Sequence, residues 1–264
     1  MELDGPALDW VRAELGPFTH VRRRAGGVAS TIHEVDAGGR RFIVRLVPPR
    51  PEVPGHDPEA EVRNEARALD ALRHLGLAPD LVAVDPAGER AGVAASIVTC
   101  LPGEVVVVPL DVDVLAEAVL AIHEVDVDLS AFPTFEPWAD VGVPPGGPDG
   151  LVHRDLHPGN VLVHGRRLGG IVDWVHACRG PIEVDVSRCR VEVAVLAGIE
   201  AADAFLERCR PVVPDYDRAW DALVVAELRP GVHDLLAFNA VGASLTVEGI
   251  RRTFDALALD AEKR

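Results

Sequence analysis

The stretch Leu151-Val-His-Arg-Asp-Leu-His-Pro-Gly-Asn160 carries two histidines, an aspartate and an asparagine in its last eight residues. Three interpretations are open. It can be a polar turn, since Pro-Gly-Asn is typical of turns. It can be a site for a first-row metal, because His153, Asp155 and His157 alternate and would share one side of an extended segment. It can also be half of a phosphoryl-transfer site, if a second carboxylate lies nearby in space.

The chain supplies that carboxylate at Asp173, 13 positions after Asn160. Short strands are predicted at Val161–His164 and Leu168–Trp174, and a hairpin between them would bring the two side chains together. In kinase-type sites, an Asn and an Asp that meet at one point hold Mg²⁺, and another Asp orients the hydroxyl. Here Asp155, five residues before Asn160, is in place to be that second Asp. Because Mg²⁺ prefers oxygen ligands to imidazole, this pattern favours the third interpretation.

The N-terminal part of the chain predicts an antiparallel sheet and one helix. Arg45 alternates with Ile43 and Val47 on one face of a strand, so its charge needs a partner. Glu65, at the edge of the apolar stripe of the helix, can be that partner. The expected strands are Phe18–Arg24, Ser30–Val35, Arg41–Val47, Leu81–Val84 and Val93–Thr99, and the helix runs from Pro58, capped by Asp57, to Gly76.

The C-terminal part is predicted to be mainly helical. A helix is expected over Val112–Val125, a Pro- and Gly-rich stretch follows over 132–150, and further helices run from Ile182 to the end. The predicted fold is therefore α+β with two lobes. Residues 1–101 would form a lobe with a five-stranded antiparallel sheet and one helix, and residues 102–264 a mainly helical lobe.

The amino-acid composition limits the kinds of molecule that the protein is expected to bind. With 264 residues, 48% of them hydrophobic, the chain can bury a sizeable core, which excludes a disordered protein. No apolar run reaches the length of a membrane span and no secretory signal is visible, so we expect a cytoplasmic protein. The net charge of −16 argues against nucleic acid and anionic membranes and favours a cationic small molecule.

With these elements in place, the sequence resembles the aminoglycoside phosphotransferase family, the small-molecule branch of the protein-kinase-like fold. The resemblance rests on HRDLHPGNVLV (153–163), GGIVDW (169–174) and RGPIEVD (179–185), and it runs from about Gly26 to Asp185. It implies transfer of the γ-phosphate of ATP, with Mg²⁺, to a hydroxyl of a small molecule. The implied acceptor is an aminoglycoside or a related antibiotic or amino sugar.

The resemblance also implies roles for residues of the second lobe. Asp155 is similar to the catalytic base that accepts the hydroxyl proton, and Asn160 and Asp173 to the Mg²⁺ ligands. His153 resembles a residue that positions the loop. Asp185 resembles the buried carboxylate that holds the loop through its backbone.

In the first lobe, Arg45 resembles the strand cation that grips the α- and β-phosphates, and Glu65 the helix carboxylate that aims it. The implied phosphate-covering turn contains Gly26, Gly27 and Ser30, where backbone N–H groups can approach phosphate oxygens. The segment IVTCLPGE (97–104) resembles the hinge between the lobes. There the Thr99 carbonyl and the Leu101 amide would face the adenine.

One segment departs from the family pattern, which usually has a longer helical insertion before the catalytic loop. Only 26 residues, 127–152, separate Asp126 from His153, and five of them are prolines. Two alternatives therefore stay open: a catalytically silent nucleotide-binding module of the same fold, and a metal-dependent hydrolase using His153, Asp155 and His157. Acidic candidates for contacts with the acceptor are Glu183, Asp203, Glu207 and Asp234.

Overall fold

The structure is a computed structural model, and it describes residues 2–24, 30–52 and 55–261. The chain forms two compact units. The first is Met1–Leu101 together with Trp174–His176, and the second is Pro102–Asp173 together with Ala177–Arg264.

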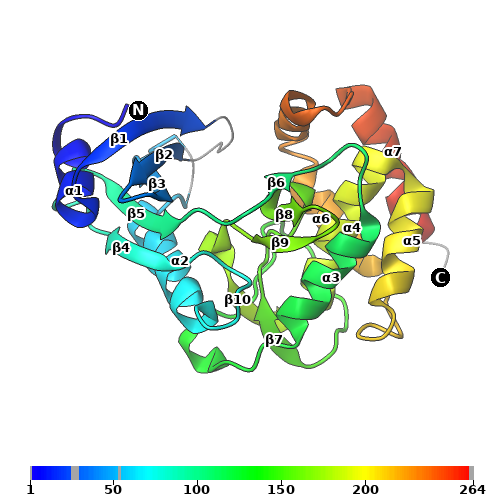
Figure 1. Ribbon diagram of the computed structural model, residues 1–264. Coiled ribbons are helices and arrows are strands. Elements are labelled where there is room, and N and C mark those ends of the chain that lie inside the picture. The colour runs from blue at the N-terminus through cyan, green and yellow to red at the C-terminus, as the bar shows by residue number, and fades with distance from the viewer. Residues whose placement is uncertain (1, 25–29, 53–54, 262–264) are drawn as a thin grey trace. The chain divides into compact units, whose positions relative to one another are not determined.

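The first unit is built on a five-stranded sheet in the order β1-β2-β3-β5-β4, and every neighbouring pair is antiparallel (Figure 1). The predicted sheet is thereby confirmed. Its strands are β1 (Phe18–Arg24), β2 (Thr31–Ala37), β3 (Arg40–Val47), β4 (Leu81–Asp85) and β5 (Ala94–Thr99).

The two faces of this sheet differ because apolar residues alternate along β3. Phe42, Val44 and Leu46 face a buried core with helix α1 (Gly5–Leu15), which contributes Trp10 and Val11. The sequence prediction did not include α1. Its apolar face is only about two turns long and follows a glycine, so the periodic signal is weak.

Helix α2 (Pro58–Leu72) lies against the other face, where Val62 packs on Val47 of β3. It begins as predicted, because Asp57 Oδ1 accepts the Ala60 N–H at 3.0 Å. The segment Trp174–His176 also packs against α2, and Asn64 Nδ2 donates to the Val175 carbonyl at 2.9 Å.

The second unit combines helices with two small sheets. β7 (Asp149–Val152) pairs with β10 (Cys178–Pro181), and β6 (Glu104–Val105), β8 (Val161–His164) and β9 (Arg167–Ile171) form the other sheet. The helices are α3 (Val112–His123), α4 (Glu183–Ala197), α5 (Ile199–Cys209), α6 (Ala219–Leu228) and α7 (Val247–Ala261).

Helix α4 is the central helix of this unit and packs against α3, α5, α6 and α7. Its residues 184–194 are all buried, including five polar or charged ones. Arg190 donates to Asp203 at 2.6 Å and to Asp221, so its charge is paired inside the unit. Among the described residues, no helix is both long and apolar enough to span a membrane.

Several local predictions differ from the structure, and the helix expected to run to Gly76 ends at Leu72. The strand expected to reach Trp174 ends at Ile171, because Asp173 takes a left-handed backbone with φ 68°. β7 and β10 were not predicted, since strands of four residues carry too little alternation to be recognised.

Candidate functional site

The loop that follows β7 is held by one buried carboxylate. Asp185 at the start of α4 is 1% exposed, and its two oxygens accept the backbone N–H groups of His153 (2.8 Å) and Arg154 (2.9 Å). Burial raises the pKa of Asp185 to about 7, although both hydrogen bonds favour the charged form. Asp185 thus ties α4 to the two residues that precede Asp155.

His153 fastens the same loop to the hairpin β8–β9. The ring is fully buried, and Nε2 lies 2.9 Å from the carbonyl oxygen of Val172, the residue before Asp173. Burial lowers the pKa of His153 to about 4, so the ring is neutral at physiological pH.

The hairpin brings Asn160 and Asp173 to one end of the sheet. Val161 pairs with Ile171, and the Val172 N–H donates to the Asn160 carbonyl at 2.9 Å. Asp173 is therefore the next residue beyond this pair. The Asn160 side chain turns its Nδ2 to the Asp155 carbonyl at 3.0 Å, which fixes the amide plane.

Asp155 itself is partly exposed and paired with an arginine. Its Oδ1 lies 2.7 Å from Arg188 Nη2, and the same nitrogen lies 2.9 Å from Glu192 Oε1. Burial works against the charge of Arg188, but the two carboxylates outweigh it and raise the pKa of Arg188. His157 completes the cluster, with Nε2 3.8 Å from Asp155 Oδ2.

Arg154 points into the second unit and anchors the loop there. Its guanidinium forms two hydrogen bonds to Glu227 on α6, at 2.7 and 3.0 Å, and it lies over the rings of Phe135 (4.6 Å) and Trp138 (3.8 Å). Its φ of 73° is unusual for a residue with a side chain, so these contacts hold a strained backbone next to Asp155.

In the first unit, Arg45 and Glu65 form the pair expected from the pattern of β3 and α2. Arg45 Nη1 lies 3.4 Å from Glu65 Oε1, and the two side chains are 10% and 9% exposed. Ser96 of β5 donates its hydroxyl to Glu65 Oε2 at 3.1 Å. Glu65 is thus held on two sides and can fix the direction of the guanidinium.

The remaining predicted residues of this unit lie at the ends of strands. Ser30 is half-buried just before β2, Thr99 ends β5 and Leu101 follows it. Thr99 is fixed by the backbone of Asp80, whose N–H donates to Thr99 Oγ1 at 2.9 Å. The phosphate-binding roles of Gly26 and Gly27 fall outside the described residues.

The oxygen atoms around the loop suit Mg²⁺. Asn160 and Asp173 offer an amide oxygen and a carboxylate at the same hairpin end, and Mg²⁺ binds through few protein oxygens and keeps several waters. Over residues 2–24, 30–52 and 55–261, no group of three or more His, Cys, Asp or Glu side chains could hold a metal ion. The hydrolase alternative required such a group at His153, Asp155 and His157.

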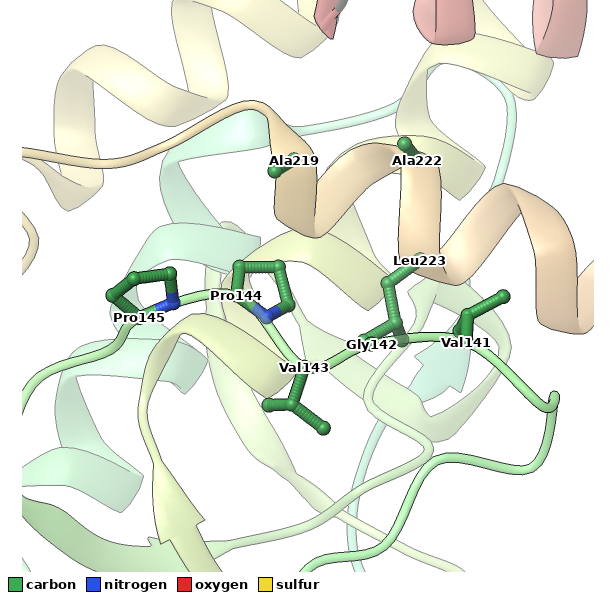
Figure 2. A pocket seen from close by; sticks show the side chains of 8 residues that line it. All are labelled: Val141, Gly142, Val143, Pro144, Pro145, Ala219, Ala222 and Leu223. Atoms are coloured by element: carbon green, nitrogen blue, oxygen red, sulfur yellow. The ribbon is translucent and has the colours of Figure 1, made fainter.

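The shortened segment before the loop packs on α6 and leaves an apolar cavity there. Pro145 accepts a hydrogen bond from Trp220 Nε1 at 3.1 Å. The cavity has a volume of about 420 Å³ and contains none of the predicted site residues (Figure 2). It is lined by Val141, Gly142, Val143, Pro144, Pro145, Ala219, Ala222 and Leu223.

Of the acidic side chains considered for the acceptor, three have partners within the unit. Glu183 accepts the Gly147 N–H at 3.0 Å, Asp203 pairs with Arg190 and Arg218, and Glu207 pairs with Arg210. The sequence did not single out Arg188 or Glu192. A signal existed, because Arg188 lies three residues and Glu192 seven residues after Asp185, which places both on the helix face that meets the loop.

Solved structures with a similar fold include phosphotransferases. One is a thermostable mutant of aminoglycoside phosphotransferase APH(4)-Ia in a ternary complex with AMP-PNP and hygromycin B, 17% identical with a TM-score of 0.66. The match covers 97% of this chain and 99% of that chain. Another is macrolide 2′-phosphotransferase MphH from Brachybacterium faecium, 19% identical with a TM-score of 0.56 over 95% and 96% of the chains. At these identities the likeness shows the fold.

Sequence relatives match only locally. A homoserine kinase of Rhizobium rhizogenes is 45% identical over 42 residues, which are 16% of this chain and 13% of the relative. A homoserine kinase of Mesorhizobium japonicum is 38% identical over 66 residues, which are 25% of this chain and 18% of the relative. The chain therefore spans less than a fifth of either relative.

The family model described as the phosphotransferase enzyme family matches residues 20–142 and 135–220. These ranges contain most of β1, all of β2 to β5, the loop with Asp155, the hairpin and α4, so the match covers both units and most of the chain. The resemblance inferred from the motifs is confirmed, and the chain belongs to the phosphotransferase enzyme family.

Proposed function

We propose that this protein is a kinase that transfers the γ-phosphate of ATP to a hydroxyl group of a small molecule. The observation that carries the proposal is the loop around Asp155. There, Asp185 accepts the His153 N–H, the His153 ring meets the Val172 carbonyl next to Asp173, and the Asn160 amide donates to the Asp155 carbonyl. A polar turn without function would need neither the strained Arg154 nor this set of anchors.

In the proposed reaction, Asp155 accepts a hydrogen bond from the acceptor hydroxyl, orients its oxygen for in-line attack and takes its proton. A bond forms between that oxygen and the γ-phosphorus, and the bond from the γ-phosphorus to ADP breaks. When bound at Asn160 and Asp173, Mg²⁺ would neutralise charge on the phosphate oxygens. Asn160 is kept in place because its amide donates to the Asp155 carbonyl.

Arg45 is proposed to bind the α- and β-phosphates from the first unit. Its planar guanidinium can contact two phosphate oxygens at once, whereas lysine offers a single point charge. Glu65, itself fixed by Ser96, would keep the guanidinium directed toward the phosphates.

The proposed acceptor is a cationic small molecule such as an aminoglycoside or a related amino sugar. The charge of −16 supports this class, because an acidic protein attracts cations. The similar proteins include an aminoglycoside phosphotransferase, a macrolide phosphotransferase and homoserine kinases, so acceptors of all three kinds belong in the test.

The first experiment is thermal unfolding of the purified chain in buffer, with MgCl₂, with Mg²⁺ plus ATP or GTP, and with ZnCl₂. A ligand at about 100 times its Kd adds about 2.7 kcal/mol of stability, which raises the midpoint by several degrees in a chain of this size. We expect a rise with nucleotide that requires Mg²⁺. A rise with zinc and none with nucleotide would contradict the proposal and restore the hydrolase.

The second experiment follows transfer of label from γ-labelled ATP to hygromycin B, streptomycin, a macrolide, homoserine and other amino alcohols. Labelled product with any acceptor supports the kinase and identifies its class. Nucleotide binding without transfer to any acceptor, and without ATP hydrolysis, would favour the catalytically silent module instead.

A further inference from the structure

Arg188 connects the proposed base to a buried carboxylate on the same helix. Its Nη2 lies between Asp155 Oδ1 (2.7 Å) and Glu192 Oε1 (2.9 Å). The Arg188 and Glu192 side chains are 9% and 1% exposed, whereas Asp155 is 20% exposed. One guanidinium therefore joins the accessible end of the loop to the interior of the second unit.

The backbone contacts of the loop do not by themselves fix the Asp155 carboxylate. Asn160 holds the Asp155 carbonyl, but the side chain can still rotate about its own bonds. Arg188 meets Oδ1 and so sets the direction of the carboxylate plane.

Glu192 in turn keeps Arg188 in place. The two residues are four apart on α4, where side chains of a helix are neighbours, and Glu192 is almost completely buried. Because the pair is shielded from water, its attraction is screened little by salt.

We propose that Arg188 is a positioning residue for phosphoryl transfer, which holds the Asp155 carboxylate in the orientation that receives the acceptor hydroxyl, while Glu192 holds Arg188. This inference rests on the proposed function of Asp155. It assigns to α4 a second contribution to the site, beyond the anchoring of the loop backbone by Asp185.

The test is a double-mutant cycle on the full chain, with hydrolysis of Mg-ATP by water as the reaction. We expect Arg188→Gln to lower kcat by about 10- to 100-fold, as for a misplaced reacting group, with the KM for Mg-ATP within about twofold of the wild type. In the Asp155→Asn background, Arg188→Gln should cause no further loss. Arg188→Lys should recover part of the activity, since it restores the charge near Asp155.

Arg218→Gln is the matched control, because Arg218 also pairs with carboxylates of the second unit, those of Asp203, Asp221 and Asp260, away from the loop. It should lower the thermal midpoint and leave kcat unchanged. An Arg188→Gln variant as active as the wild type would overturn the inference, as would an equal loss with and without Asp155→Asn. If Arg188→Gln does not fold, Arg188→Met, which keeps an unbranched apolar stem and carries no charge, decides in the same cycle by the same criterion.

Failure of this inference differs from failure of the proposed function. In the first case the wild type is stabilised by Mg-ATP and hydrolyses it, and only the cycle shows no coupling. In the second case the wild type neither responds to Mg-ATP nor turns it over, and the inference about Arg188 falls with the proposal.

Discussion

At the scale of residues, the loop owes its shape to buried polar groups that each meet a defined partner. Asp185 accepts two backbone N–H groups, His153 meets the Val172 carbonyl, and Arg154 is bound by Glu227. Such groups are costly to bury without partners, so each contact excludes other conformations of the loop. Asp155, whose side chain is partly exposed, is placed by its neighbours.

Replacement of the proposed base should affect turnover far more than binding. Asp155→Asn keeps the shape of the side chain but removes its ability to accept a proton, so we expect a loss of about 10²- to 10⁴-fold in turnover. The affinity for Mg-ATP, measured by thermal shift or calorimetry, should stay nearly unchanged, because the proposed nucleotide and Mg²⁺ contacts of Arg45, Asn160 and Asp173 remain. Equal turnover in the variant would remove the assignment of Asp155 as base.

His153 makes the fold sensitive to acid. Its pKa is about 4 in the folded chain and about 6.5 when unfolded, so the unfolded state binds the proton more tightly. The stability from this group is present above about pH 6.5 and is lost as pH falls toward 4, a change of up to about 3 kcal/mol.

The measurement is urea unfolding of the wild type and of His153→Asn between pH 7 and pH 4.5. The wild type should lose more stability than the variant over this range, because only the wild type must protonate the buried ring of His153. Both proteins contain Asp185, so its titration changes their stabilities equally and cancels in the difference between them. Parallel losses would show that His153 does not titrate as inferred.

At the scale of elements, the two termini of the hairpin β8–β9 and the first turns of α4 define the site together. β8 begins after Asn160, β9 ends before Asp173, and α4 begins two residues before Asp185. The three side chains therefore stand where regular structure starts or stops. Such places leave side chains near the backbone of several elements at once, while the strands and the helix supply rigidity.

The contact between Arg154 of the loop and Glu227 of α6 should contribute strongly to the free energy of unfolding. The Glu227 side chain is fully buried, so Glu227→Ala leaves the Arg154 guanidinium without its carboxylate and should cost about 3–5 kcal/mol in urea unfolding. Arg252→Gln, which breaks an exposed pair with Glu248 on α7, is the control and should leave stability unchanged. A small effect of Glu227→Ala would mean that the aromatic rings alone suffice to hold Arg154.

The sequence predicted the elements whose patterns are long and regular. The five strands of the first sheet and α2 were recoverable from alternation, turns and a cap, and the Arg45–Glu65 pair followed from a lone charge on an apolar face. The residues around Asp155 were predicted through motif spacing. β7, β10 and α1 were missed because their patterns are short, and the roles of Arg188 and Glu227 depend on contacts between distant segments.

At the scale of the whole molecule, acidity is distributed over a chain with 42 acidic and 26 basic residues. Many of the arginines are tied to carboxylates, as in the pairs of Arg188, Arg190 and Arg218. The remaining negative charge should attract cations from a distance and repel anionic polymers.

The electrostatic field of this negative charge predicts that kcat/KM for any cationic acceptor depends on the salt concentration. Raising ionic strength from about 0.01 M to about 0.1 M shortens the Debye length from about 30 Å to about 10 Å, so kcat/KM for such an acceptor should fall. A neutral acceptor such as homoserine is the comparison and should respond much less. If both acceptors responded alike, the overall charge would have no part in acceptor capture.

The arginine that faces Glu65 in the first unit also bears on how the protein can be labelled. Reagents that acylate amines need a lysine side chain, and the only lysine of this sequence is Lys263, at the far end of the chain. At position 45 such a reagent would meet a guanidinium, which stays protonated and is a poor nucleophile. With Arg45 in its proposed phosphate-binding role, a chemical survey that finds kinases by tagging an amine among their phosphate-binding residues would therefore pass over this protein.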